Sequence, residues 1–208
     1  MGPLPGVGRE PKTAYVFDVS TGQQLVKLTP SDATAYDRFG ASVGLSGDVA
    51  IVGSPGGAFG GHVNSAYLFD VTTGQGLFKL TPSDGESADG FGLSVAIDGN
   101  TAIVGAKHHN SSTGSAYLFD VMTGQEVLKL TASDAAAGDW FGYSVAVSGD
   151  IAIVGAPQSG AGAAYLFDVT SGVQLAKLTS GLQSGHFGWS VGINGDTAVV
   201  GMLASRSA

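Results

Sequence analysis

One short motif recurs four times along the chain, at intervals of about 50 residues. Ala-Tyr-Val-Phe-Asp-Val begins at Ala14, and Ala-Tyr-Leu-Phe-Asp-Val begins at Ala66, Ala116 and Ala164. Each copy is followed by Lys-Leu-Thr, then by Phe-Gly, and then by a strand-like segment that ends in Val-Gly. A repeat of this length indicates one structural unit that is copied and stacked, so each copy must bury its apolar surface against its neighbours.

Each unit predicts four short β-strands. Around the second copy these strands are expected at 66–71, 77–81, 91–97 and 101–105, all rich in β-branched and aromatic residues and bounded by turn residues. Large and small side chains alternate along 91–97, which predicts that both faces of the sheet are buried. No stretch shows sustained helical periodicity. The pattern therefore predicts an all-β fold, a β-propeller of four-stranded antiparallel blades.

The order of the strands predicts how the propeller closes. The chain starts with the third and fourth strands of a blade, at 14–19 and 25–29, and ends with the first and second, at 187–193 and 197–201. We expect these ends to pair, which would complete a fourth blade and close a four-bladed ring. Half of an eight-bladed dimer and a segment of a longer array are the alternatives, so a monomer or a homodimer is expected.

The amino-acid composition limits the classes of partner that the chain is expected to bind. The net charge is −8 and only 12% of residues are charged. No basic face for nucleic acid is visible, and an acidic chain is a poor partner for an anionic membrane. No apolar run reaches the length of a membrane helix, and no cysteine is present for a disulfide or thiolate metal site. We assign 1–13 to an extension without signal-peptide features, 14–201 to the propeller and 202–208 to a tail.

The Phe-Gly and Val-Gly-Ala-Pro segments resemble the FG-GAP repeats of integrin α-subunits and of bacterial surface or secreted proteins. The clearest pairs are Phe39-Gly40 with 52–55 and Phe141-Gly142 with 154–157. The resemblance implies a propeller without catalytic activity that serves adhesion or the recognition of a protein or carbohydrate, at an extracellular, cell-surface or periplasmic location. Integrin-like blades often carry an acidic calcium loop between their first two strands. Here that connection is a tight turn such as 98–100, so no cofactor is expected and the calcium sites are not carried over.

Two sets of connections vary in length and are expected on one face of the disc. They are the second-to-third-strand loops 54–65, 106–115 and 156–163, and the loops that precede each Phe-Gly; together they are called the loop face. Variable loops on a rigid scaffold are common recognition sites. The candidate binding residues on this face are Asp37, Asp89, Asp139, His186, Phe59, His62, His108 and His109.

Asp37, Asp89 and Asp139 each lie two residues before Phe-Gly. A repeated polar turn residue usually satisfies backbone donors in its own loop. The alternative is a ring of carboxylates at the channel mouth that holds a cation such as calcium or a basic partner, although His186 interrupts the ring. The adjacent histidines, His108 and His109, are a weaker candidate for a transition-metal site.

The predicted function is a non-catalytic binding or scaffolding module. One alternative is an enzyme or lectin whose site lies at the acidic channel mouth, and another is a structural propeller that self-assembles. Gly-x-Ser-x-Gly occurs around Ser42 and Ser190, but a nucleophile elbow needs a strand–turn–helix context that the sequence does not predict. The residues Ala41, Leu93, Tyr143 and Trp189 occupy one repeat position that differs between blades, which we interpret as an adjustment of shape in the core; the alternative is that Tyr143 and Trp189 line a small pocket.

Overall fold

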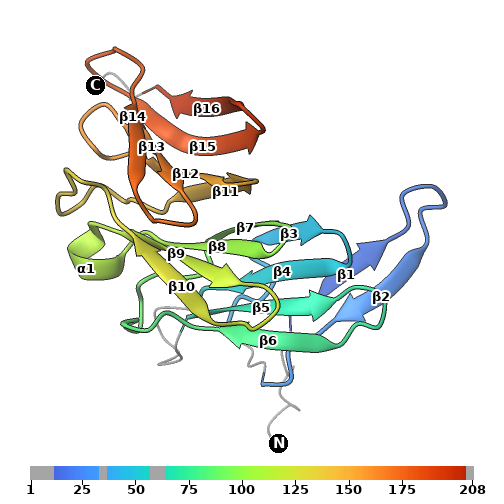
Figure 1. The fold of residues 1–208 in the computed structure, drawn as a ribbon. Helices are drawn as coiled ribbons and strands as arrows, with labels where there is room; N and C mark the ends of the chain where they lie inside the picture. Colours follow the sequence, from blue (N-terminus) through green and yellow to red (C-terminus); the bar gives the residue numbers. More distant parts are fainter. Residues whose placement is uncertain (1–11, 33–36, 57–63, 205–208) are drawn as a thin grey trace, which may run out of the picture.

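The computed structural model describes residues 12–32, 37–56 and 64–204. Over these residues the fold is a β-propeller stack in which three antiparallel sheets are complete, four-stranded blades (Figure 1). The first complete blade contains β3 (Val43–Ser46), β4 (Val49–Ser54), β5 (Ser65–Asp70) and β6 (Gly76–Leu80). The second contains β7 (Ser94–Asp98), β8 (Thr101–Ala106), β9 (Ser115–Asp120) and β10 (Glu126–Leu130). The third contains β11 (Ser144–Ser148), β12 (Ile151–Ala156), β13 (Ala163–Asp168) and β14 (Gln174–Leu178).

The expected closure of the ring is wrong. The sheet of β1 (Ala14–Phe17) and β2 (Gln24–Leu28) has two strands, and so has the sheet of β15 (His186–Asn194) and β16 (Thr197–Leu203). Among the described strands, β1 pairs with β2 alone and β16 with β15 alone. The two sheets lie at opposite ends of the stack (Figure 1). The angle between blades is fixed by packed side chains, and over this length it does not bring the ends together.

The first strand of a blade starts later than the sequence pattern predicts. We expected it to begin at Phe91, but β7 begins at Ser94. Gly92 has φ +88°, and a Cβ there would lie 2.4 Å from the carbonyl oxygen of Ser65. Glycine therefore turns the chain and lets it approach β5 of the preceding blade closely, while Phe91 enters the core. In the last unit, β15 runs through this point with a register irregularity between Phe187 and Ser190.

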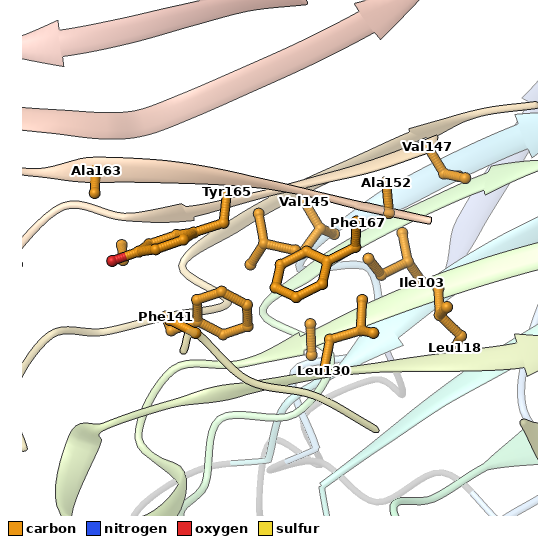
Figure 2. Close-up of a cluster of buried hydrophobic side chains, with 14 residues drawn as sticks. Ile103, Leu118, Leu130, Phe141, Val145, Val147, Ala152, Ala163, Tyr165 and Phe167 are labelled. Carbon is orange, nitrogen blue, oxygen red and sulfur yellow. The ribbon is translucent and has the colours of Figure 1, made fainter. Parts of the chain in front are cut away.

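Apolar side chains fill the space between neighbouring sheets. One cluster joins Ile103, Leu118 and Leu130 of the second complete blade to residues of the third (Figure 2). On the opposite side, Phe141 packs edge-on against Tyr165 and Phe167, with ring centroids 5.6 Å and 5.8 Å apart. The two other clusters repeat this arrangement around Phe39 and Phe91. Stability therefore comes from contacts between adjacent blades, as in other repeat proteins.

Hydrogen bonds also join the blades at their inner strands. The Ser42 hydroxyl donates to the carbonyl of Gly92 in the next blade at 2.8 Å, and Ser144 donates to Gly188 at 2.8 Å. Gly53 lies against the same carbonyl, because a Cβ on it would be 2.0 Å from the Gly92 oxygen. Ser42, which lies in one of the two Gly-x-Ser-x-Gly segments, is thus part of the joint between blades.

Within the described residues the helical content is one short turn. It is α1 (His109–Ser112), which lies in the loop between β8 and β9 and contains left-handed φ angles at Asn110 and Ser111. In the part of the chain that the structure describes, no helix has the length and apolarity to cross a bilayer.

Candidate binding face

The two variable sets of loops meet on one face, and backbone hydrogen bonds hold them together. The N–H of Gly56 donates to the carbonyl of Asp37 at 3.0 Å, and His108 donates in the same way to Asp89 at 2.9 Å. Gln158 repeats the contact with Asp139 at 3.2 Å. In each complete blade, the loop after the second strand is therefore tied to the residue two positions before Phe-Gly. This is the rigid support that a recognition surface needs.

The aspartates two residues before Phe-Gly make local contacts through their side chains. A carboxylate oxygen of Asp89 accepts from the N–H of Glu86 at 2.7 Å, and Asp139 accepts from Ala136 at 3.0 Å. Asp89 is buried. Across the described ranges no group of three or more His, Asp or Glu side chains is placed to hold a metal ion. A ligand role for these carboxylates stays a prediction, and Phe59 and His62 lie outside the described residues.

The adjacent histidines have different surroundings. His109 is buried, with Nδ1 2.9 Å from Asp89 and Nε2 2.9 Å from Nζ of Lys129. His108 is exposed and lies edge-on to Trp140 at 6.2 Å. Partial burial, together with the charge of Lys107, lowers the pKa of His108. The two imidazoles therefore do not converge on one site.

A Tyr–Asp–Lys contact recurs on the loop face, and the sequence analysis missed it. Asp84 accepts from the Tyr117 hydroxyl at 2.8 Å and pairs with Lys129 at 2.5 Å. The same contact is made by the sets Asp32, Tyr67, Lys79 and Asp134, Tyr165, Lys177. The signal was present, since all three residue types recur at fixed repeat positions. The three lysines neutralise these three loop aspartates.

An aromatic cluster lies further along the loop face, and here it is called the aromatic shelf: Trp140, Tyr143, Trp189 and Lys107. The Trp140 and Tyr143 rings are stacked at 5.9 Å with 7° between their planes, and Trp189 contacts Tyr143 at 4.5 Å. The Lys107 ammonium lies 4.7 Å from the centroids of both Trp140 and Tyr143. Our sequence analysis gave Tyr143 and Trp189 as pocket residues only as the alternative to core packing, and it missed Trp140 and Lys107.

The electrostatics of the shelf are set by its lysine. Partial burial lowers the pKa of Lys107. Of the carboxylates that the structure describes, none lies within ion-pair distance of Lys107. Beside the shelf, His186 lies 6.0 Å from Trp189, and its Nδ1 is 3.2 Å from the carbonyl oxygen of Pro157. The shelf thus combines large aromatic surfaces with a partly desolvated cation.

Six described residues of this face other than glycine have positive φ angles, and two of them stand directly before Phe-Gly. Trp140 has φ 60° and Arg38 has φ 52°, whereas the same repeat position in the second complete blade is Gly90 with φ +71°. A non-glycine residue in this region costs about 1–2 kcal/mol. Residues held against such a cost cluster at functional sites, because the side chain is needed there. Trp140 has the largest side chain among these six residues.

A hollow of about 380 Å³ continues the face from the shelf toward the first complete blade. Arg38, Gly90, Leu93 and His108 are among its lining residues. His108 connects the two features, since its ring contacts Trp140 on the shelf. His108 therefore lies at the border between the shelf and the hollow.

Comparison with known proteins fits this geometry. No curated protein matches the sequence. Among solved structures, the crystal structure of the computationally designed Ika4 protein has a TM-score of 0.58 and 21% sequence identity. The match covers 88% of this chain and 99% of that one, and it supports the fold alone. The sequence profile of the FG-GAP repeat matches residues 23–69, 77–119 and 125–167, well over half of the chain. The chain therefore belongs to the FG-GAP repeat family.

Proposed function

We propose that this chain is a non-catalytic binding module that holds a partner protein on its aromatic shelf. The observation that carries the proposal is Trp140, a large side chain kept on the loop face at a backbone position where glycine is preferred. Tryptophan and tyrosine are enriched among the residues that dominate binding energy at protein interfaces. FG-GAP repeats are typical of extracellular proteins, which agrees with a role in adhesion or extracellular assembly.

The charges of the face favour an acidic segment of the partner. Lys107 is partly desolvated and has no described ion-pair partner, while Asp32, Asp84 and Asp134 are already paired with lysines. A carboxylate placed near Lys107 regains favourable electrostatics in a site of low local dielectric. A neighbouring apolar side chain of the partner would then cover Trp140. The chain as a whole is negatively charged and repels acidic partners, so the positive charge of Lys107 selects where an acidic segment binds.

Contacts of the polar groups support a role without catalysis. The Asp89–His109 pair resembles half of a catalytic arrangement, but the remaining imidazole nitrogen lies 2.9 Å from Lys129. A general base needs that nitrogen to reach a substrate proton. Ser42 and Ser144 donate to carbonyls of the next blade. These groups are engaged in holding loops and blades together.

Intrinsic fluorescence provides a direct test, because both tryptophans of the chain belong to the shelf. The probe is a displayed library of random peptides, from which binders are selected on the folded protein and then titrated. We expect the selected peptides to combine Asp or Glu with an apolar residue and to change the tryptophan emission. We also expect Trp140→Gly and Lys107→Gln each to weaken binding by at least about 30-fold, as for a hot-spot residue.

The matched control is Met122→Ala, which removes an exposed side chain from the turn between β9 and β10 and should leave binding unchanged. Peptides that bind the Trp140→Gly variant as tightly as the unmodified protein would refute the role of the shelf. A fluorescence response to oligosaccharides with none to peptides would replace the protein partner with a glycan.

A further inference from the structure

The two terminal sheets are complementary halves of one blade. In every complete blade the second strand pairs with the third, as β4 does with β5 and β8 with β9. By repeat position, β16 is a second strand and β1 is a third strand. Within the described residues, neither has a partner on that edge. Each end of the stack therefore presents unpaired backbone N–H and C=O groups, which are a template for pairing with another chain.

Apolar side chains at these ends are exposed, whereas those at the same repeat positions of the internal blades are buried. Tyr15 and Phe17 of β1 are 49% and 54% exposed, whereas Tyr117 and Phe119 at the same repeat positions are 0% and 2% exposed. Val199 of β16 is 70% exposed, whereas its three equivalents, Ile51, Ile103 and Ile153, are 0% exposed. At the opposite end of the stack, Val43 and Leu45 are similarly uncovered. The packing of the internal blades therefore shows which side chains would cover the exposed ones at each end.

The internal blades also predict the register of the missing pair. In the first complete blade, Ala50 pairs with Phe69 and Ser54 pairs with Ser65. At the same repeat positions, Ala198 would pair with Phe17, and Met202 with Thr13. Phe187 would then lie beside Tyr15 and Phe17, as Phe39 lies beside Tyr67 and Phe69 at 5.7 Å and 5.8 Å.

We propose that β16 of one copy pairs with β1 of a second copy, so that two copies complete a blade at each of two seams. The two half-blades of one chain lie at opposite ends of its stack, with three complete blades packed between them (Figure 1). The two ends of one copy differ, so one copy alone has an unpaired strand edge at each end. When two copies pair at both seams, no strand edge remains unpaired. The occupant that we propose for each end is the other end of an identical chain, because each half-blade supplies the strands that the other lacks.

One residue makes the seam different from the internal joints. Leu182 takes the repeat position of Asp32, Asp84 and Asp134, and it is exposed. The seam therefore lacks the carboxylate that pairs with tyrosine and lysine inside the array, and it places an apolar side chain beside Tyr15 instead. More apolar contacts are typical of permanent interfaces between subunits.

The chain contains no cysteine, so an introduced pair reports the seam without background. The variant Thr13→Cys with Met202→Cys places the two sulfurs on directly opposed residues, within the range that a disulfide spans. After oxidation we expect a disulfide between two chains on a non-reducing gel. The control, Met122→Cys with Met202→Cys, should remain unlinked. Light scattering of the unmodified protein should give about 41 kDa, twice the 20.7 kDa of one chain.

Val199→Asp completes the test, because this side chain is exposed in one copy and should not disturb its folding. We expect this variant to become monomeric while its circular dichroism and its shelf fluorescence stay unchanged. A monomeric mass for the unmodified protein at all concentrations up to 100 μM would overturn the proposal. A disulfide within one chain in the Thr13→Cys, Met202→Cys variant would overturn it as well, since it would mean closure by the same molecule.

Discussion

Replacing Leu118 with alanine tests the central packing of the stack. Leu118 is 1% exposed and lies in the cluster between the second and third complete blades (Figure 2). The substitution removes three carbon atoms, worth about 2.4 kcal/mol at about 0.8 kcal/mol each. The cavity left behind adds to this, because backbone on both sides is fixed by hydrogen-bonded strands. We expect a total loss of about 3–4 kcal/mol in the free energy of unfolding.

The matched control is the same substitution at Leu175, an outer-strand residue that is 52% exposed. About half of its transfer free energy is already forfeited in the native state, and no closed cavity forms, so Leu175→Ala should cost about 1 kcal/mol or less. Urea unfolding at one protein concentration measures both values, and thermal melts should fall by about 6–16 °C for Leu118→Ala. Holding the concentration fixed matters if copies associate.

Equal losses for the two variants would refute the packing argument. So would a loss below about 1 kcal/mol for Leu118→Ala, since a buried leucine that can be removed at that cost is not in a close-packed interface. A change in the urea dependence, with little change in the midpoint, would show that the substitution altered the denatured state or broke two-state behaviour instead.

Three further predictions concern the loops and joints. Arg38→Gly should raise the free energy of unfolding by about 0.5–1 kcal/mol, because it relieves a left-handed φ of 52°; a lower urea midpoint would contradict this. Gly142→Ala should cost at least about 3 kcal/mol, since its Cβ would lie 2.2 Å from a carbonyl oxygen, whereas Gly149→Ala, also at positive φ but in open space, should cost about 1 kcal/mol. The hydrogen bond from Lys177 lowers the pKa of Asp134 below 3.8. The stabilisation by this pair is therefore full above that pH and is lost as pH falls through the lowered pKa. The difference in urea midpoint between Asp134→Asn and the unmodified protein should shrink between about pH 6 and about pH 2, and a constant difference would refute the pairing.

The number of strands in each blade was predictable from the sequence because the same pattern of residues occurs in several copies of one unit. Alternating side chains and turn residues indicated four strands, and all three complete sheets have them. The start of the first strand was misplaced at Phe91, since the positive φ of Gly92 is not visible in a pattern of large and small residues. Closure was misjudged for a similar reason. Strand order shows that two halves match, but the angle between packed blades decides whether they meet.

The loop face was only partly predictable. Sequence reasoning selected polar residues, and the structure engages Asp89 and His109 with each other. Trp140 was overlooked because it stands where other units have arginine, glycine or histidine, and a position that varies between repeats looks unconstrained. The positive φ of Trp140 shows that its backbone conformation is energetically unfavourable, and a φ angle can be read only from a structure.

The joint between Ser42 and Gly92 has a consequence for how such a protein can lengthen or shorten. Each complete blade contributes a serine and a close-packed glycine on the side that faces the next unit. Ser42 and Ser144 donate to a glycine carbonyl there, and Ser94 accepts from the N–H of Val145. A segment of about 50 residues that is duplicated or deleted within a gene therefore carries both halves of the connection, wherever the cut falls. Neighbours need no matching changes to accept the insertion. Arrays of different length can then arise in single genetic events, and selection is left to act on the loops.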